Sequence, residues 1–489
     1  MVFNSYSFLL FFPIVLVLTQ LAPAKWRNGL LLVASYVFYA SWGKRFCVLL
    51  LGLTVLVYAA GLLLGQEKRR WLFWLGLGGT LGALLVYKYL DFGLYSINAL
   101  TRALGLGEPM PRVSLLQPAG ISFFTFQAAG YLIDVYRSKY KPEKNFLRFA
   151  LFVSFFPQLL SGPIGRGDQL LPQYERPKKA DFDALRRGFL TMTWGFFLKL
   201  CIADRAAVLV NTVYENYESY SGIFLVFATA VYALQIYGDF AGYSYMAIGG
   251  AEMLGIHLPK NFDTPYFAQS VQEFWRRWHI SLSSWFRDYV YIPLGGSRCA
   301  SWKKYRNVFI VFLVSGLWHG ALWTFVLWGA IHGFYQIFGA VTKPLREKAL
   351  DGLRVNRQAA SYKLFRMVIT FALVDFAWLF FRAEGLDIAA AMVKRIVTGL
   401  HPEELPEELV GQYYTMGLDP QDFWALLLCT AVLLLVDGLQ YRGKDLKAWF
   451  ASQNWLFREL ALAVILLTIF IFGIWGNGFD ASSFIYFKF

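Results

Sequence analysis

The chain has 489 residues, of which 57% are hydrophobic and only 16% are charged. A water-soluble protein of this length cannot bury so much apolar surface, so the composition excludes a soluble globular class and indicates a membrane protein. The net charge of +14 does not indicate nucleic-acid binding, because Lys and Arg gather in loops between apolar runs, as the positive-inside tendency requires.

Apolar runs of about 15 to 20 residues, long enough for a helix to cross a bilayer, recur from one end of the chain to the other. They lie near residues 5–21, 28–42, 46–65, 71–90, 115–135, 146–162, 188–204, 220–256, 307–341, 366–381, 422–440 and 459–476. Two of them, 220–256 and 307–341, are too long for a single pass. The pattern predicts one all-α polytopic membrane domain over 1–489, with about ten to twelve transmembrane or re-entrant helices.

The first run could be mistaken for a signal peptide, since Ala22-Pro23-Ala24 resembles a cleavage site. No positive charge precedes it and further spans follow at once, so we expect a retained helix. The four cysteines show no paired spacing, and the chain has no HExxH, zinc, nucleophile-elbow or dinucleotide-binding motif. We therefore predict no metal site and no disulfide framework.

The charged loops predict the orientation of the chain. Basic loops lie at 137–148, 166–187, 298–306, 343–366 and 442–447. The segment 401–422 carries six Asp and Glu residues and no Lys or Arg. We expect 343–366 and 442–447 in the cytoplasm, with 401–422 and the C-terminal tail outside.

Polar residues inside apolar runs are costly and mark candidate functional positions. In YGDFAGYSYMAIGG, residues 237–250, Asp239 lies between two glycines, and either caps the second half of a broken helix or lines a cavity. In QLLSGPIGRGDQL, residues 158–170, the glycines and Pro163 predict a re-entrant turn that carries Arg166; no Gly-Lys-Ser/Thr follows, so it is not a phosphate-binding loop.

The stretch FWRRWHISLSSWFRD, residues 274–288, mixes charge with tryptophan. On a helical period its apolar residues share one face and its polar residues another, which predicts an amphipathic helix at the membrane interface with tryptophans at headgroup depth. His279 falls between the two faces, beside Leu282 and Ser283.

The run 307–341 predicts either two short helices or one bent helix, and His319 lies near its middle. Trp318 and Trp323 flank this histidine, and Gly316 and Gly320 would let another molecule come close. Histidine is the side chain best suited to proton transfer near neutral pH, so His319 is the first catalytic candidate and His279 the second.

Several stretches, taken together in this order, resemble the membrane-bound O-acyltransferase (MBOAT) family, and in particular its bacterial alginate O-acetylation branch. They lie at 117–137, 154–166, 237–255, 273–298 and 316–333, with FAWLFFRAEGLDIA at 376–389 and the closing SFIYFKF. The resemblance covers nearly the whole chain. Tyr245 departs from it, since relatives often carry Asp there, and this departure bears on substrate or donor handling.

The resemblance implies an all-helical fold around a central tunnel, with N-terminal helices over 1–110, an MBOAT core over 111–400 and C-terminal helices over 401–489. It places the family's near-invariant histidine at His319 and a second polar position at His279. It also implies a bacterial cytoplasmic (inner) membrane, no bound cofactor, and acetyl-CoA or another cytoplasmic acyl carrier as donor. The implied partners are membrane lipid, an extracytoplasmic polysaccharide acceptor such as alginate, and proteins that assist its acetylation.

The leading hypothesis is acetyl transfer to a hydroxyl outside the membrane. His319 would act as general base or carry the acyl group transiently, and His279 would orient the acceptor or donate to the oxyanion. Arg276 and Arg277 would hold donor phosphate or anchor the helix at headgroups. The remaining candidates for substrate or donor binding are Asp239, Ser283, Trp318 and Trp323.

Three other hypotheses stay open. The same fold could transfer D-alanine from a carrier protein to teichoic acid. The chain could be a non-catalytic conduit for an acyl group or glycan, or a hub that recruits a soluble acetylase. A conduit would tolerate replacement of both histidines, and a hub would not depend on His319.

Overall fold

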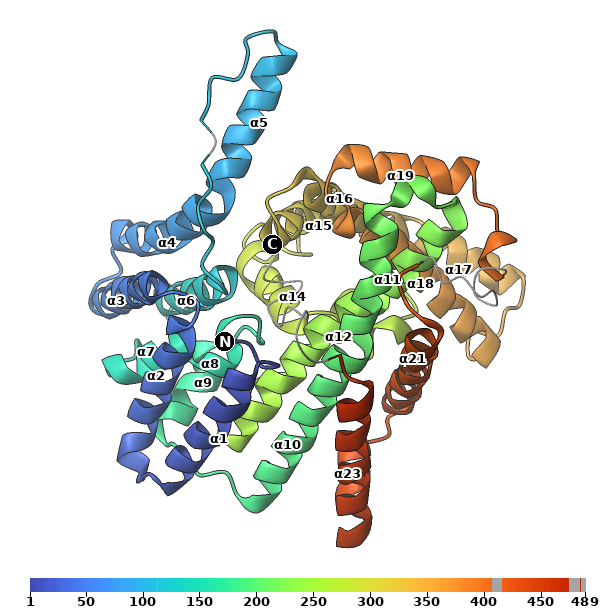
Figure 1. Ribbon diagram of the computed structural model, residues 1–489. Coiled ribbons are helices and arrows are strands. Elements are labelled where there is room, and N and C mark those ends of the chain that lie inside the picture. The colour runs from blue at the N-terminus through green and yellow to red at the C-terminus, as the bar shows by residue number, and fades with distance from the viewer. Residues whose placement is uncertain (112, 407–415, 475–483, 485–489) are drawn as a thin grey trace. The chain divides into compact units, whose positions relative to one another are not determined.

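The computed structural model describes residues 1–111, 113–406, 416–474 and 484, and these residues form helices and loops without any strand (Figure 1). The α-helices are α1 (Tyr6–Leu21), α2 (Ala24–Ala40), α3 (Lys44–Gln66), α4 (Arg70–Leu84), α5 (Leu90–Ala103), α6 (Ile121–Tyr136), α7 (Phe146–Ser154), α8 (Phe156–Leu159), α9 (Gly167–Glu175), α10 (Phe182–Phe196), α11 (Asp204–Glu215), α12 (Gly222–Met253), α13 (Val271–Arg277), α14 (Ile280–Phe286), α15 (Ser301–His319), α16 (Trp323–Val341), α17 (Lys343–Gly352), α18 (Ala360–Arg382), α19 (Leu386–Thr398), α21 (Pro420–Tyr441), α22 (Leu446–Ala451) and α23 (Trp455–Phe472). Three π-helical segments are η1 (Leu85–Tyr89), η2 (Phe197–Ala203) and η5 (Arg287–Tyr291), and two 3-10 turns are η3 (Tyr217–Ser219) and η4 (Pro265–Phe267).

Helix starts follow local capping chemistry. The side chains of Ser5, Asn145 and Ser270 accept hydrogen bonds from backbone N–H groups in the first turns of α1, α7 and α13. Asp419 and Asp445 do the same for α21 and α22. These short polar side chains satisfy amides that have no partner within the helix, so the sequence sets where these five helices begin.

The all-α polytopic class is confirmed. Seven of the described helical segments are long and apolar enough to cross a membrane: Lys44–Gln66, Arg70–Ala103, Gly222–Met253, Trp323–Val341, Ala360–Arg382, Pro420–Tyr441 and Trp455–Phe472. This count is below ten to twelve because several predicted spans form shorter helices; α1, α2 and α6, for example, have 16, 17 and 16 residues.

The chain divides into two compact units. The first comprises Met1–Met192 and Tyr243–Pro259 with Phe484. In it α1 lies beside α2, and α3, α4 and α6 pack together (Figure 1). Its core is rich in phenylalanine: Phe8 and Phe38 are each 1% exposed or less, and their rings meet edge to face 6.2 Å apart.

The second unit comprises Thr193–Gly242 and residues 260–474. It contains η2, α11, the first two thirds of α12 and all helices from α13 to α23. Helices α15 and α16 form a tight antiparallel hairpin, and α18 packs against α16. All candidate site residues lie in this unit.

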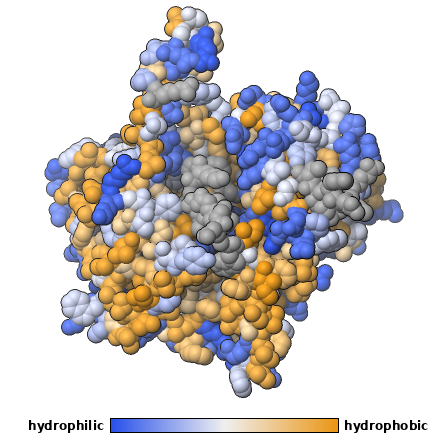
Figure 2. All heavy atoms as spheres, viewed as in Figure 1, coloured by the Kyte–Doolittle hydropathy of each residue, from blue (hydrophilic) through white to orange (hydrophobic). Residues whose placement is uncertain are grey.

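Hydrophobic side chains also cover outward faces, as lipid contact requires. In Figure 2 the surfaces over α1, α2 and α23 are mostly hydrophobic. Only 6% of the α23 span is buried within the chain, against 72% for α12, so α23 presents almost its whole circumference outward.

Two expectations about the long runs are resolved. The run 220–256 does not break at the glycines: α12 is one continuous helix through 237–250, so the prediction that Asp239 caps a second half-helix is wrong. The run 307–341 does form two helices. The turn predicted at 158–170 is present as the link between α8 and α9, and its re-entrant placement in the membrane stays a prediction.

Some predictions fall outside the described residues. These are the acidic Glu407 and Glu408 and most of the closing SFIYFKF stretch. The division of one domain at residues 110 and 400 stays a prediction.

Candidate active site

The stretch 271–291 is not one amphipathic helix but two short ones, α13 and α14, with a break at Trp278 and His279. His279 takes left-handed backbone angles, φ 44° and ψ 55°, which no residue in a continuous helix adopts. The break turns the His279 ring into the protein, where it is 0% exposed. The prediction of a single interfacial helix is therefore wrong, because helical periodicity does not register a one-residue break.

The tryptophans of this stretch are not headgroup anchors. Trp275, Trp278 and Trp285 are 8%, 0% and 6% exposed. The Trp278 ring stacks on Phe274 at 5.4 Å and meets Trp378 of α18 at 5.2 Å. They pack the core that supports the break.

Asn261 fixes the tautomer of His279. The Asn261 Oδ1 atom lies 3.2 Å from His279 Nδ1, 3.2 Å from the Ser281 backbone N–H and 2.9 Å from Ser281 Oγ. A backbone N–H can only donate, so this atom must be the carbonyl oxygen, and His279 Nδ1 must carry a hydrogen to donate to it. In the neutral imidazole, Nε2 then holds the lone pair and acts as a base or acceptor.

The surroundings of His279 keep it neutral. Burial lowers the pKa of His279 well below the ordinary value of 6.5. The Phe240 ring of α12 meets the imidazole edge to face at 4.6 Å, and Trp318 meets it at 5.7 Å.

His319 is the last residue of α15, at the turn of the α15–α16 hairpin rather than in mid-helix, and it is 2% exposed. Three aromatic rings surround it, Trp318 at 5.0 Å, Trp328 at 5.0 Å and Phe381 at 5.4 Å.

The glycines beside His319 serve the hairpin itself. A Cβ at Gly316 would overlap the Phe325 carbonyl, and one at Gly320 would overlap the Phe325 ring. The prediction that these glycines leave room for a second molecule is wrong, because Phe325 of the same chain fills that space.

The break and the hairpin bring the two histidines together. Their ring centroids are 6.4 Å apart, with the planes at 60°. Trp318 touches both rings. Two imidazoles this close can act on the same bound substrate group. Forty residues of sequence separate these two groups, and only the fold makes them neighbours.

His332, by contrast, has a structural role. It is fully buried, and its Nδ1 accepts a hydrogen bond of 3.2 Å from Trp275 Nε1. This ties α16 to α13 and leaves His332 outside the pair.

The two arginines differ. Arg277 is held by Glu273 at 2.9 Å and by the Asp263 carbonyl at 3.1 Å, and its guanidinium lies over the Tyr441 ring at 5.2 Å. Arg276 is exposed. Arg277 thus has intramolecular partners for its charge, whereas Arg276 faces outward.

The remaining candidates for substrate or donor binding differ in their distance from the His279–His319 pair. Trp318 is 3% exposed and belongs to it, whereas Trp323 is 49% exposed at the start of α16. Ser283 Oγ donates to the Trp278 carbonyl at 3.4 Å. The Asp239 carboxylate pairs with Lys199 at 2.6 Å.

Sequence reasoning missed Asn261, Phe240, Trp328 and Phe381, which position the two rings. Only the asparagine carried a signal, as a polar residue just before the tryptophan-rich stretch. Within the described part of the chain, no group of three or more His, Cys, Asp or Glu side chains is placed to hold a metal ion.

The chain is similar in sequence to known membrane acyltransferases. The model of the MBOAT, membrane-bound O-acyltransferase, family matches residues 142–374, which include both histidines. The chain is 43% identical over 399 residues to the probable alginate O-acetylase AlgI of Pseudomonas putida, covering 80% of this chain and 79% of the relative. It is 35% identical over 409 residues to the peptidoglycan O-acetyltransferase of Helicobacter pylori, covering 77% and 74%. With the teichoic acid D-alanyltransferase of Bacillus subtilis it shares 29% identity over 294 residues, covering 56% and 72%.

Proposed function

Because the chain belongs to the membrane-bound O-acyltransferase family and is a multi-pass membrane O-acetyltransferase, we propose that it acetylates hydroxyls of an extracytoplasmic polysaccharide at the His279–His319 pair. The observation that carries this proposal is the meeting of two buried imidazoles, 6.4 Å apart, from separate elements. A buried pair of this kind, walled by tryptophan and phenylalanine, excludes water from a reactive acyl group.

His319 acts as general base. It takes the proton from an incoming hydroxyl as the oxygen attacks the acyl carbonyl carbon, and it returns that proton to the departing donor thiolate. Positioned bases of this kind contribute roughly 10²–10⁴ in rate. The alternative, a transient acyl-histidine, uses the same residue as nucleophile.

His279 orients the acceptor. Its Nδ1–H is held by Asn261, so Nε2 presents a lone pair and accepts a hydrogen bond from a sugar hydroxyl. Donation to an oxyanion would need the protonated ring, which burial opposes. Of the two roles considered for His279, the tautomer favours orientation over oxyanion stabilisation.

The acyl donor is acetyl-CoA or another cytoplasmic acyl carrier, and the chain itself holds no resident cofactor. Arg276 is the better candidate for a donor phosphate, because its guanidinium faces outward while Arg277 is already paired with Glu273. The route between donor and acceptor is the tunnel that the family resemblance implies.

The names of the relatives support the acceptor class. The AlgI relative, at 43% identity over four fifths of the chain, favours alginate or a similar exopolysaccharide. The acceptor is met outside the bacterial cytoplasmic (inner) membrane, together with partner proteins of polysaccharide acetylation. D-alanyl transfer to teichoic acid is the weaker candidate, since those relatives match only 56% of the chain or less.

The test is polymer O-acetylation in cells that carry His319→Gln, with His332→Gln as a matched control and membrane levels of both equalised. We expect acetyl to be lost with the first change and retained with the second, because only His319 belongs to the pair. Normal acetylation in His319→Gln cells would reject the acyl-transfer site and favour a conduit or a recruiting hub.

A further inference from the structure

A buried cluster of three charges lies behind the histidine pair. Lys199 is 1% exposed, and its Nζ contacts Asp204 Oδ1 at 2.8 Å and Asp239 Oδ1 at 2.6 Å. Both carboxylates belong to residues that are 4% exposed or less. Charges so deeply buried are costly unless they are paired, so each group depends on the others for its place.

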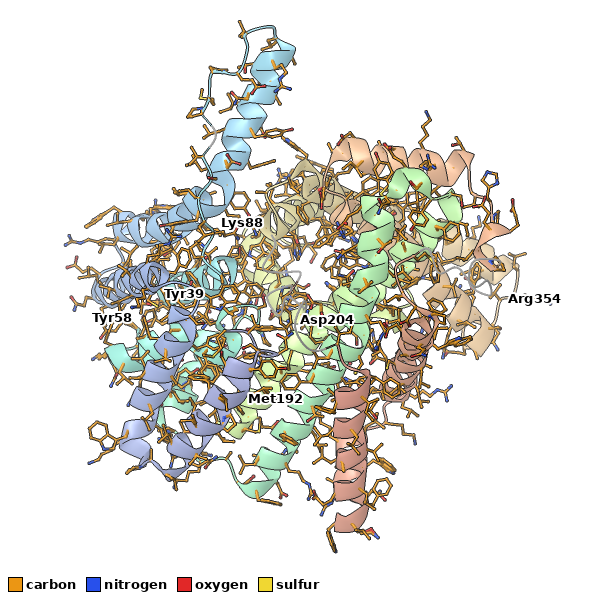
Figure 3. All side chains as sticks on the ribbon, viewed as in Figure 1. Tyr39, Tyr58, Lys88, Met192, Asp204 and Arg354 are labelled. Carbon is orange, nitrogen blue, oxygen red and sulfur yellow. The ribbon has the colours of Figure 1, made fainter. Side chains whose placement is uncertain are left out.

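The cluster joins two helices at unusually close range. Lys199 lies in the π-helical η2, and Asp204 (labelled in Figure 3) begins α11, while Asp239 lies on α12. A Cβ at Gly238 would come within 2.9 Å of the Leu198 carbonyl oxygen, and one at Gly242 within 2.9 Å of the Gly195 carbonyl oxygen. Glycine at both positions therefore lets the α12 backbone rest on the end of α10 and on η2, which brings the Asp239 carboxylate to Lys199.

A second bond holds the same turn of α12 from another side. Tyr237 is 1% exposed, and its hydroxyl donates to Asp437 Oδ2 of α21 at 2.8 Å. Its ring meets Trp278, the residue before the His279 break, at 6.1 Å. Two polar anchors two residues apart, directed to different helices, fix the rotation of α12 about its own axis.

The next residue transmits this rotation to the active site. Phe240 follows Asp239 directly, and its ring meets the His279 imidazole at 4.6 Å and 85°. It also packs edge to face on Phe262 at 5.0 Å, beside Asn261. A turn of α12 by a fraction of its pitch would move Phe240 off the imidazole and allow the ring to tilt about its hydrogen bond to Asn261.

We propose that Asp239 is a positioning residue for acyl transfer: its ion pair with Lys199 fixes the rotation of α12, and through Phe240 this holds the His279 ring toward His319. The inference rests on the proposed function of the histidine pair. Asp204 has a different role. It begins α11, directly after η2, so its ion pair with Lys199 of η2 balances the lysine charge but does not connect to α12.

The two aspartates provide a matched test. Asp239→Asn and Asp204→Asn each remove one negative charge next to the same lysine, and each leaves Lys199 one carboxylate partner. If the cluster only balanced charge, the two variants would behave alike. Positioning predicts that Asp239→Asn lowers kcat at least about tenfold with little change in KM, as expected when an interaction acts in the transition state only. Asp204→Asn is expected to stay within about twofold, since α12 keeps its charged anchor.

A second readout does not depend on activity. The chain has only five histidines, so the protein labelled with ¹⁵N-histidine in nanodiscs gives few imidazole signals, and His279→Gln identifies those of His279. We expect Asp239→Asn to shift or broaden the His279 signals and Asp204→Asn to leave them in place. Phe240→Leu should reproduce the Asp239→Asn result with the charge cluster intact, while Phe224→Leu, at a buried position on the same helix, should not.

Equal effects of the two aspartate changes, or unmoved His279 signals in both Asp239→Asn and Phe240→Leu, would overturn the proposal. If Asp239→Asn does not fold, Phe240→Leu against Phe224→Leu decides the question. If the unaltered protein transfers no acetyl group, the proposed function fails, and the histidine spectra still decide whether Asp239 positions the ring.

Discussion

Asn261 is the residue on which the chemistry of His279 depends. Its single carbonyl oxygen accepts from the imidazole, from a backbone amide and from a serine hydroxyl, so one side chain sets both the tautomer and the orientation of the ring. Asn261 does not itself react with the substrate. Its loss would still disturb the geometry of His279, which contacts the substrate in the proposed reaction.

We expect Asn261→Ala to lower turnover roughly ten- to hundredfold, because a buried donor that loses its acceptor costs about 1–3 kcal/mol. The measurement is acetyl transfer by purified protein in detergent or nanodiscs. Asn307→Ala is the control: Asn307 is equally buried but donates to the Leu294 carbonyl, so its loss should affect stability more than rate. Unchanged turnover in Asn261→Ala would contradict the assigned tautomer.

The low pKa of His279 has a consequence for stability. In the unfolded chain a histidine binds a proton below about pH 6.5, whereas the folded site does not, so the unfolded state gains protons as the pH falls. Stability should therefore decrease on acidification from pH 6.5, by up to about 1.4 kcal/mol per pH unit from this one residue. Thermal unfolding between pH 5 and 7.5 should show a weaker pH dependence in His279→Gln than in the unaltered protein. The same pH dependence in both proteins would contradict a neutral His279 in the folded state.

Among individual residues, the sequence was sufficient to identify the two histidines of the site as candidates. His279 and His319 stand out because imidazoles are rare in such an apolar chain. Asn261 could not be found in the same way, since its partners lie 18 and 20 residues away and meet it only in the folded loop.

At the scale of elements, the α15–α16 hairpin owes its tightness to glycines on both helices. A Cβ at Gly316 would overlap the Phe325 carbonyl, and one at Gly329 would overlap the Phe312 carbonyl. Each helix thus packs backbone against backbone, and His319 is carried at the end of the closest-packed stretch.

Gly316→Ala is expected to destabilise the protein by about 1–3 kcal/mol through overpacking. Gly339→Ala on the same hairpin meets no atom within 4 Å and should be neutral or stabilising by up to about 1 kcal/mol, because alanine favours the helix. Apparent melting temperatures of the two variants provide the comparison. Shifts of the same sign would argue against backbone contact as the cause.

Sequence patterns located most helices but not their interruptions. Composition and the length of the apolar run were sufficient to locate α3 and its ends: a span over 46–65 was predicted, and the helix Lys44–Gln66 is found. They were not sufficient at His279, because a periodicity analysis assumes that the helix is continuous through the stretch. They also suggested a break in α12 at its glycines, which instead permit close packing against η2.

At the scale of the whole molecule, the spanning helices constrain the topology. Helices α18 and α21 are each long enough to cross, and we expect residues 383–406, which follow α18, to lie across the membrane from 343–359 and 442–454. This agrees with the separation of basic from acidic loops along the sequence, whereas the assignment of sides rests on the positive-inside tendency.

Single cysteines at exposed positions test that assignment in a background without the native cysteines. Arg354→Cys and Lys444→Cys should react with a membrane-impermeant maleimide only after the cytoplasmic side is opened. His401→Cys should react in intact spheroplasts, because it follows α18 and precedes α21. Labelling of Arg354→Cys and His401→Cys from the same side would contradict the topology.

The charge cluster around Lys199 also bears on how the chain is made. Membrane insertion of a lone lysine or aspartate near the middle of a helix costs about 2.5–3.5 kcal/mol each. Lys199 and Asp204 leave the ribosome within five residues of each other and pair along one continuous helix, so this helix can enter the bilayer already partly neutralised. Asp239 emerges 40 residues after Lys199, a delay of roughly 2 to 8 seconds at ordinary rates of synthesis. The order of synthesis therefore lets the Lys199–Asp204 pair form before Asp239 is made, and α12 completes the cluster afterwards.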